Sequence, residues 1–271
     1  MIQIIIFSKD RACQLELLIR SMLKMWPEAV VFRPTIIWKA TNQRFRQGYN
    51  SLIGMYNWVD FVEEDERGFR GVLLDTISEH TPFIQFLVDD DIFVFPFSTE
   101  DKNFQEFAKD PDTMCLSLRL SPQINHSYMR DVPAPPPEFV SENCWVWRGC
   151  GSKEWDYGMS LDGSVYRTAP ILYRLRVMNY NGPNQLEGAL ADSPMRDLYM
   201  RCCNRSIVVG IPNNKTQECN PNNRSGNWPL DRLNDRWLDE ERISHGILLE
   251  DLSFKHNAVH VEVPYLFESR E

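Results

Sequence analysis

Residues 83–95 read FIQFLVDDDIFVF, so Asp89, Asp90 and Asp91 stand together between two apolar segments. Three adjacent carboxylates repel one another, and burial penalises their ionised forms further. The triplet must therefore either face water in a turn, where aspartate is common, or lie against a cation. The apolar residues on both sides hold it next to the core, and hard divalent cations prefer carboxylate oxygens. We therefore expect a divalent metal site here, with a solvated turn as the alternative.

Short β-branched runs alternate with helix-patterned segments in the first third of the chain. The expected strands are residues 2–7, 35–40, 58–62 and 82–88. Between them, apolar residues recur at helical spacing in segments that begin near residues 10, 42 and 68. This alternation predicts an α/β fold with a Rossmann-type, mostly parallel sheet and helices on both faces. Ligands of such sheets bind at the carboxyl ends of the strands, where the aspartate triplet lies.

The pattern becomes irregular after residue 95. Residues 130–143, RDVPAPPPEFVSEN, hold too many prolines for regular structure, because proline fixes φ and lacks an amide donor. The expected strands are 114–120, 144–149, 206–212 and 258–267, with a further turn, strand and helix start in 159–175. The expected helices lie near 103–110, 183–203 (in two pieces) and 230–242. We expect one domain over residues 1–271, with a nucleotide-binding half at 1–95 and an irregular half at 96–271.

Composition excludes several classes of protein. The net charge of −9 argues against a general nucleic-acid-binding protein, which needs a basic stripe. No apolar run approaches the roughly 20 residues of a membrane span, and the first residues lack the basic segment of a secretory signal. The seven cysteines form no C-x-x-C pair and are expected to be reduced thiols. These features predict a cytoplasmic protein with no nucleic-acid partner and no transmembrane segment.

Sequence motifs argue against other kinds of acidic or phosphate-binding site. No G-x-x-x-x-G-K-[ST] loop is present, and no G-x-G-x-x-G follows the first strand. The D-x-D-x-[TV] pattern of one phosphatase class fails because Phe93 occupies its last position. Residues 8–14, SKDRACQ, lack the glycines that sugar-nucleotide pyrophosphorylases carry after their first strand. A sugar-phosphate nucleotidyltransferase is therefore disfavoured, and it stays open as an alternative beside a non-catalytic nucleotide- or carbohydrate-binding module.

The chain resembles GT-A-fold, nucleotide-sugar-dependent glycosyltransferases of the family 2-like, D-x-D type. The stretches that carry the resemblance are IIIFSKDRACQLELLIRSM (4–22), VDDDIF (88–93), MSLDGSVYRTAPIL (159–172) and PNQLE (183–187). The resemblance implies a GT-A-like fold whose second half, 96–271, binds the acceptor. It also implies an inverting transfer of a sugar from a nucleoside-diphosphate sugar to a hydroxyl of a glycan or another acceptor. The implied cofactor is Mn²⁺ or Mg²⁺.

In enzymes of this type, the loop after the first strand meets the nucleoside. The corresponding residues, which end or follow the strand here, are Phe7, Ser8, Lys9 and Arg11. The resemblance places Asp89 or Asp90 at the ribose, so both count with the nucleotide-binding residues. It places Asp91 at the metal ion that bridges to the diphosphate.

Two carboxylates are candidates for the base that would deprotonate the acceptor hydroxyl. Family 2-like enzymes place this base at a helix start, and Glu187 follows Pro183 and Asn184 in the expected first helical turn. A helix N-terminus favours the ionised form that a base needs. Asp162, in the SLDG turn, is the rival. Glu187 is preferred, with an ordinary solvated helix carboxylate as the alternative interpretation.

His260 is the histidine with the most specific placement. In residues 258–267, strand alternation puts His260 on the face opposite to Val259 and Val261. Many GT-A enzymes take a third metal ligand, often histidine, from the C-terminal region. The resemblance thus implies His260 as a metal ligand beside Asp91, and a partly buried histidine with other partners is the alternative.

Overall fold

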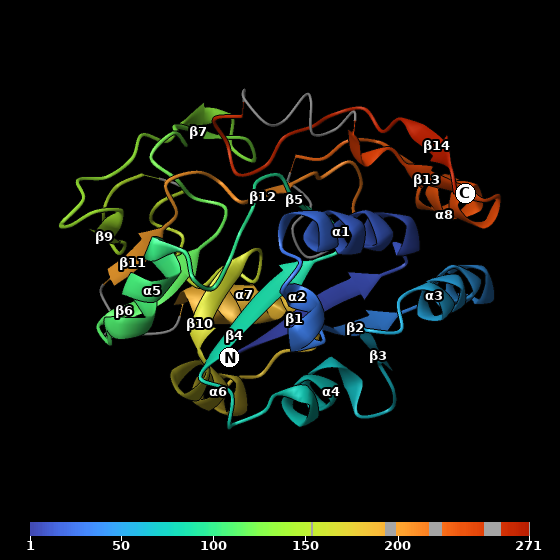
Figure 1. The fold of residues 1–271 in the computed structure, drawn as a ribbon, viewed down its shortest axis with the longest axis horizontal. Coiled ribbons are helices and arrows are strands. Elements are labelled where there is room, and N and C mark those ends of the chain that lie inside the picture. The colour runs from blue at the N-terminus through green and yellow to red at the C-terminus, as the bar shows by residue number, and fades with distance from the viewer. Residues whose placement is uncertain (153, 193–198, 217–223, 247–255, 271) are drawn as a thin grey trace.

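The computed structural model describes residues 1–152, 154–192, 199–216, 224–246 and 256–270. The strands of the main sheet are β1 (Ile2–Lys9), β2 (Thr35–Lys39), β3 (Asp60–Glu63), β4 (Phe83–Val88), β6 (Thr113–Ser117), β9 (Cys144–Val146), β10 (Ser164–Arg167) and β11 (Tyr199–Cys202). They form one eight-stranded sheet in the order β3-β2-β1-β4-β10-β6-β11-β9 (Figure 1).

The first four strands of the chain run parallel to one another. β1 pairs with β2 on one side and with β4 on the other, and β3 pairs with β2. The centre of β1, residues 4–7, is apolar, and so is β4 apart from Gln85, as expected for parallel strands that are covered on both faces. The register from Ile2 opposite Phe83 to Phe7 opposite Val88 brings their carboxyl ends side by side. The predicted α/β class with a mostly parallel sheet is confirmed, and the loops after β1 and β4 share one edge.

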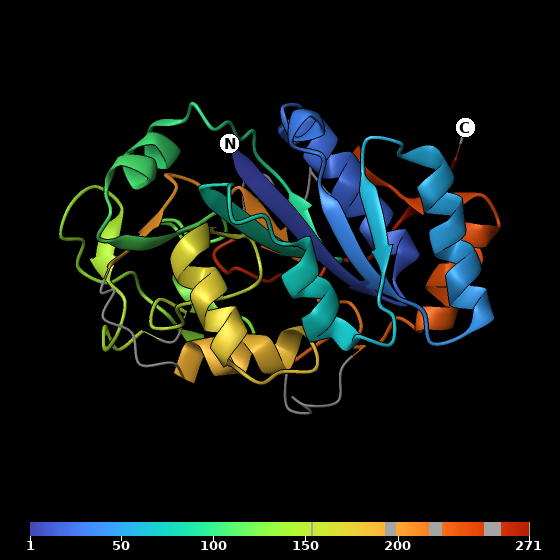
Figure 2. The same cartoon turned by 90° about the horizontal axis from the view of Figure 1, so that it is seen from below.

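Helices cover both faces of the sheet, as predicted (Figure 2). The helices are α1 (Ala12–Met25), α2 (Ala29–Phe32), α3 (Gln43–Met55), α4 (Gly68–Thr76), α5 (Lys102–Lys109), α6 (Thr168–Val177), α7 (Pro183–Asp192) and α8 (Leu230–Leu238). In β1, Ile4 and Ile6 pack in the hydrophobic cluster that includes α1. Ile5 and Phe7 point the other way, into the cluster formed with α4, α6 and α7. In the described part of the chain, no helix combines the length and apolarity needed to span a membrane.

The second half of the chain completes the same sheet. β10 runs antiparallel to both β4 and β6, so strands from before and after residue 95 lie side by side. The helices expected near 183–203 and 230–242 are wrong at their ends: residues 199–202 form strand β11 between β6 and β9, and residues 241–242 belong to a strand, β13 (Glu241–Ile243). In β11, pairing with two neighbours outweighs the local helical pattern. Residues 193–198 of the first expected helix lie outside the described residues.

Short strands beyond the main sheet bring the C-terminal segment to the triplet. β5 (Asp91–Phe93) pairs with β12 (Val208–Gly210), and Gly210 lies opposite Asp91. Gly210 also forms an isolated bridge with His260, so the strand expected over residues 258–267 is reduced to this bridge. A Cβ on Gly210 would lie 2.5 Å from Cδ2 of His260. The other short strands are β7 (His126–Ser127) with β8 (Val132–Pro133), and β13 (Glu241–Ile243) with β14 (Phe267–Ser269).

Candidate functional site

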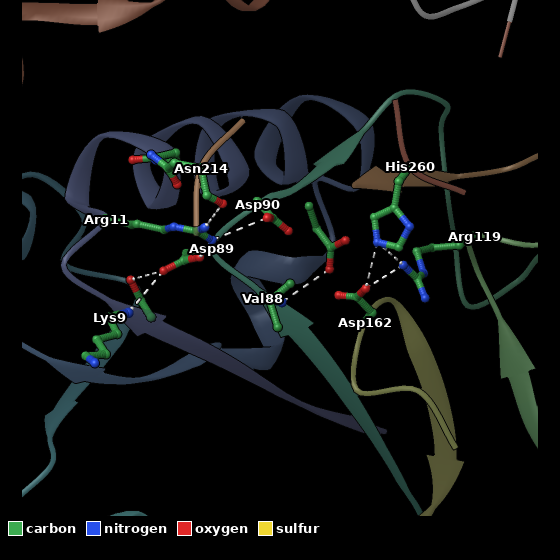
Figure 3. Close-up of polar contacts among 12 residues, drawn as sticks. Lys9, Arg11, Val88, Asp89, Asp90, Arg119, Asp162, Asn214 and His260 are labelled. Atoms are coloured by element: carbon green, nitrogen blue, oxygen red, sulfur yellow. Dashed lines mark hydrogen bonds and ion pairs between the residues drawn. The ribbon is translucent and has the colours of Figure 1, made fainter. Parts of the chain in front are cut away.

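Asp89 links the turn after β4 to the loop after β1 (Figure 3). Its Oδ2 accepts hydrogen bonds from Ser8 Oγ (2.9 Å) and from the Lys9 amide (3.0 Å). Its Oδ1 pairs with Nη1 of Arg11 at 2.9 Å. The side chain is buried, so its ionised form depends on these donors. Asp89 is therefore held as a structural carboxylate.

The guanidinium of Arg11 is buried and pairs with groups of the protein itself. Besides pairing with Asp89, Nη1 pairs with Oδ2 of Asp90 at 3.3 Å, and Nη2 donates to the carbonyl oxygen of Asn214 at 2.5 Å. The residue is only 7% exposed. The direct contact between Arg11 and a nucleotide that the resemblance implies does not agree with this geometry. Arg11 is a buried counterion of the triplet.

Replacing Arg11 by methionine is expected to lower the free energy of unfolding by about 3 kcal/mol, because breaking a buried ion pair leaves Asp89 without its counterion. The measurement is urea unfolding at neutral pH. Arg33→Met is the control, since the pair that Arg33 forms with Asp60 has side chains 59% and 51% exposed and should contribute little. Equal losses in the two variants would contradict the role of Arg11.

The other residues expected at the nucleoside differ in what they present. The ring of Phe7 packs against Phe69 and Phe86, at centroid distances of 5.2 and 5.7 Å, and is a core residue. The hydroxyl of Ser8 is buried and already engaged by the triplet. Lys9 has an exposed side chain. Of the residues predicted in this loop, Lys9 is the one whose side chain a ligand can reach without rearrangement.

Two adjacent carboxylates of the triplet, Asp90 and Asp91, meet a distant third, Asp162, and the three are here called the aspartate trio. One oxygen from each lies within 4.8 Å of the others. Asp162 belongs to the turn before β10, and the pairing of β10 with β4 brings it next to the triplet. Oδ1 of Asp91 and Oδ1 of Asp162 are buried and have no hydrogen-bond partner. Buried carboxylate oxygens without donors fit a divalent cation, which binds hard oxygen ligands.

The pKa values of the trio indicate that its negative charge is only partly compensated. Burial raises the pKa of Asp90 to about 6, and the charge on Asp162 adds to the shift. Burial and the charge on Asp162 also raise the pKa of Asp91 well above its usual range. Burial opposes ionisation of Asp162 too, but Arg119 and His260 outweigh it and lower its pKa to about 2. A bound cation would relieve the repulsion that remains at Asp90 and Asp91.

His260 lies beside Asp162, with its ring held by Arg119 (Figure 3). Nε2 of His260 is 3.4 Å from Oδ2 of Asp162 and 3.0 Å from Nη1 of Arg119. Nε2 therefore lies between the guanidinium of Arg119 and the carboxylate of Asp162. Arg119 also forms an ion pair with Asp162. His260 thus adjoins the trio, with Nε2 beside Arg119 and Asp162 and with Nδ1 buried and without a hydrogen-bond partner.

Glu187 extends from α7 to the turn that carries Asp162. Its Oε1 accepts a hydrogen bond from the Leu161 amide at 2.9 Å, and the hydroxyl of Tyr157 donates to the same carboxylate. Because α7 begins at Pro183, Glu187 lies in the second helical turn, and its expected place in the first turn is wrong. Burial, followed by the charge on Asp162, raises the pKa of Glu187. The helix dipole, which fades after the first turn, does not lower it.

Arg119 and Asn214 are site residues that the sequence analysis missed. Arg119 follows β6 in the segment MCLSLRL (114–120), where a single charged residue ends an apolar strand. Arginine is seldom buried unless paired, so this position is itself a signal for a buried acidic partner. Asn214 carries no comparable signal, because it meets Arg11 through its backbone carbonyl.

Comparison with known proteins gave one curated relative. No family model matches the chain. The bifunctional glycosyltransferase pgtA of Dictyostelium discoideum is 24% identical over an alignment of 195 positions that covers 63% of this chain. The chain spans about a quarter (24%) of the length of that relative.

Several solved structures overlap with 74% of the chain. TarS of S. aureus in complex with UDP-GlcNAc is 17% identical, with a TM-score of 0.45 and 58% of its own chain covered. The mannosyltransferase PcManGT of Pyrobaculum calidifontis, in complex with GDP-Man and Mn²⁺, is 10% identical, with a TM-score of 0.41 and 53% covered. The 4-diphosphocytidyl-2C-methyl-D-erythritol synthase of Anaerococcus prevotii is 9% identical, with a TM-score of 0.37 and 86% covered.

TM-scores below 0.5 mark only a partial likeness to these structures. In sequence, the chain is similar to a glycosyltransferase, in agreement with the resemblance carried by its VDDDIF and PNQLE segments.

Proposed function

We propose that this protein is a metal-dependent, GT-A-type glycosyltransferase that moves a sugar from a nucleoside-diphosphate sugar to a hydroxyl of a glycan or another acceptor. The observation that carries the proposal is the meeting of Asp90, Asp91 and Asp162 at the carboxyl edge of a parallel sheet, where nucleotides bind. Glu187 is hydrogen-bonded to the residue before Asp162, so a further carboxylate adjoins the trio. Sequence similarity to a curated glycosyltransferase supports the reaction class.

The aspartate trio is the proposed holder of the divalent cation, Mn²⁺ or Mg²⁺. Such a cation, bound there, supplies Lewis-acid stabilisation of the charge on the departing diphosphate. Asp162 thereby takes the role of a metal ligand in addition to Asp91. Asp89 and Arg11 keep the turn in place, and Lys9, exposed at the same edge, is available to the phosphates or the nucleoside.

Glu187 is the proposed general base. An acceptor hydroxyl has a high pKa, so its attack on the anomeric carbon needs a carboxylate that takes the proton. Burial, and then the charge on Asp162, raises the pKa of Glu187, which makes it a stronger base than an exposed glutamate. Asp162 is a poor base, because Arg119 and His260 overcome the effect of burial and lower its pKa to about 2. In-line attack assisted by Glu187 would invert the anomeric carbon.

Metal-dependent nucleotide binding tests the proposal. UDP and GDP would be added at about a hundredfold excess over Kd, where binding to the folded state alone stabilises it by roughly 2.7 kcal/mol. The melting temperature is expected to rise more in Mn²⁺ than in EDTA with at least one of these nucleotides. Equal shifts of the melting temperature in Mn²⁺ and in EDTA would contradict metal-dependent nucleotide binding.

A turnover assay separates the proposal from its rivals. A glycosyltransferase releases nucleoside diphosphate from a nucleotide sugar when a hydroxyl acceptor is present. A sugar-phosphate nucleotidyltransferase instead joins a nucleoside triphosphate to a sugar phosphate and releases pyrophosphate. A non-catalytic binding module would show the metal-dependent thermal shift and form neither product.

A further inference from the structure

Arg119 places a positive charge within the cluster of carboxylates. The residue is 7% exposed, its Nη1 pairs with Asp162, and its Nη2 donates to Ser160 Oγ at 2.9 Å. Its aliphatic stem passes Gly163, where φ is 64° and a Cβ would lie 3.0 Å from Cγ of Arg119. The turn that carries Asp162 therefore packs directly on the arginine, and the guanidinium is held at this carboxylate.

The guanidinium of Arg119 contacts two groups that a divalent cation could use. Nη1 is paired with Asp162 of the trio and lies 3.0 Å from Nε2 of His260. The charge of Arg119 also acts on Asp91. A cation at the trio is repelled by a guanidinium this close. Nε2 of His260 in turn can ligate a metal only when Nη1 of Arg119 moves away from it.

We propose that Arg119 is an internal competitor of the metal ion. It weakens cation binding at the trio on its own and, when the donor diphosphate is present, directs its charge to the phosphate oxygens, which the guanidinium fork fits. Metal and diphosphate then bind cooperatively, because each offsets the charge that opposes the other. The weakening of cation binding depends on the trio alone, whereas the cooperativity with the diphosphate rests on the proposed function.

Mn²⁺ binding without nucleotide tests the competition, with free Mn²⁺ measured by electron paramagnetic resonance. Arg119→Gln is expected to bind Mn²⁺ at least about fivefold more tightly than the wild type, because a unit positive charge beside the ligands is removed. Arg201→Gln is the matched control: Arg201 is equally buried, at 6% exposed, and pairs with Glu106 of α5. Its Mn²⁺ affinity should equal that of the wild type. Unchanged or weaker binding by Arg119→Gln would overturn the proposal.

Repeating the titrations with UDP or GDP tests the cooperativity. In the wild type the nucleotide should tighten Mn²⁺ binding by about tenfold, and Arg119→Gln should lose most of this gain. If neither nucleotide binds to the wild type, the proposed function fails, and the titration without nucleotide still decides the competition. If the nucleotide binds and Arg119→Gln keeps the full gain, the proposed cooperativity is wrong.

Arg119→Lys covers the case in which Arg119→Gln does not fold, since the ammonium still compensates Asp162. Lysine lacks the fork that contacts Asp162 and Ser160 together. In Arg119→Lys, the increase in Mn²⁺ affinity that the nucleotide causes should therefore be at least about threefold smaller than in the wild type. The Mn²⁺ affinity without nucleotide should stay within about twofold of the wild-type value. If the folded Arg119→Lys variant showed the same nucleotide-dependent increase in Mn²⁺ affinity as the wild type, the guanidinium would have no role in diphosphate binding.

Discussion

Asp91→Asn is expected to make the protein more stable in EDTA and to remove its stabilisation by Mn²⁺. Asp91 is 1% exposed, and its Oδ1 has no hydrogen-bond partner. Burial and the charge on Asp162 raise the pKa of Asp91. An acid whose pKa is raised by folding costs stability at pH values above its unfolded pKa, because ionisation is less favourable in the native state. Asparagine removes this cost and also removes the proposed metal ligand.

The unfolding free energy and the rate of nucleoside diphosphate release measure the two effects. Loss of the metal should slow release at least about 10³-fold, since such an ion supplies several kcal/mol of charge stabilisation. Asp89→Asn is the control from the same triplet: Asp89 is satisfied by Ser8, Lys9 and Arg11, so its variant should keep the response to Mn²⁺. A full response in Asp91→Asn would exclude Asp91 from the metal site.

Glu187→Gln is expected to lower kcat by about 10³-fold and to leave Mn²⁺-dependent nucleotide binding intact. General-base catalysis contributes about 10²- to 10⁴-fold, and glutamine cannot take the proton. Glutamine keeps an oxygen that can accept the hydrogen bond from the Leu161 amide, 2.9 Å long in the structure. The turn should therefore stay in place, so that the lost rate reports on the missing base. Single-turnover rates and nucleotide-induced melting shifts measure the two quantities.

Asp162→Asn distinguishes the base from the metal ligand. We expect this variant to lose its response to Mn²⁺ together with turnover, whereas Glu187→Gln loses turnover alone. A wild-type kcat in Glu187→Gln would remove Glu187 from the role of base. A normal Mn²⁺ response in an inactive Asp162→Asn variant would instead pass that role to Asp162.

The sheet strands of residues 1–95 were predictable because their signals are local. Strands such as Ile2–Lys9 and Phe83–Val88 are apolar runs separated by helical patterns, and that alternation is sufficient to predict a parallel sheet. The second half was less predictable, since its pairings are long-range. Residues 199–202 carry a helix-compatible pattern and become a strand because β6 and β9 flank them.

Residue pattern alone was enough to predict the parallel sheet and the acidic turn at the carboxyl end of its fourth strand, because each depends on neighbours within a short stretch of chain. It could not tell apart three adjacent aspartates, whose roles depend on distances through space. Pairing of β10 with β4 brings Asp162 to the triplet, and the bridge from Gly210 brings His260. Charge compensation acts only between groups a few ångströms apart. Asp89 forms an ion pair with Arg11, whereas Asp91 lies next to Asp162.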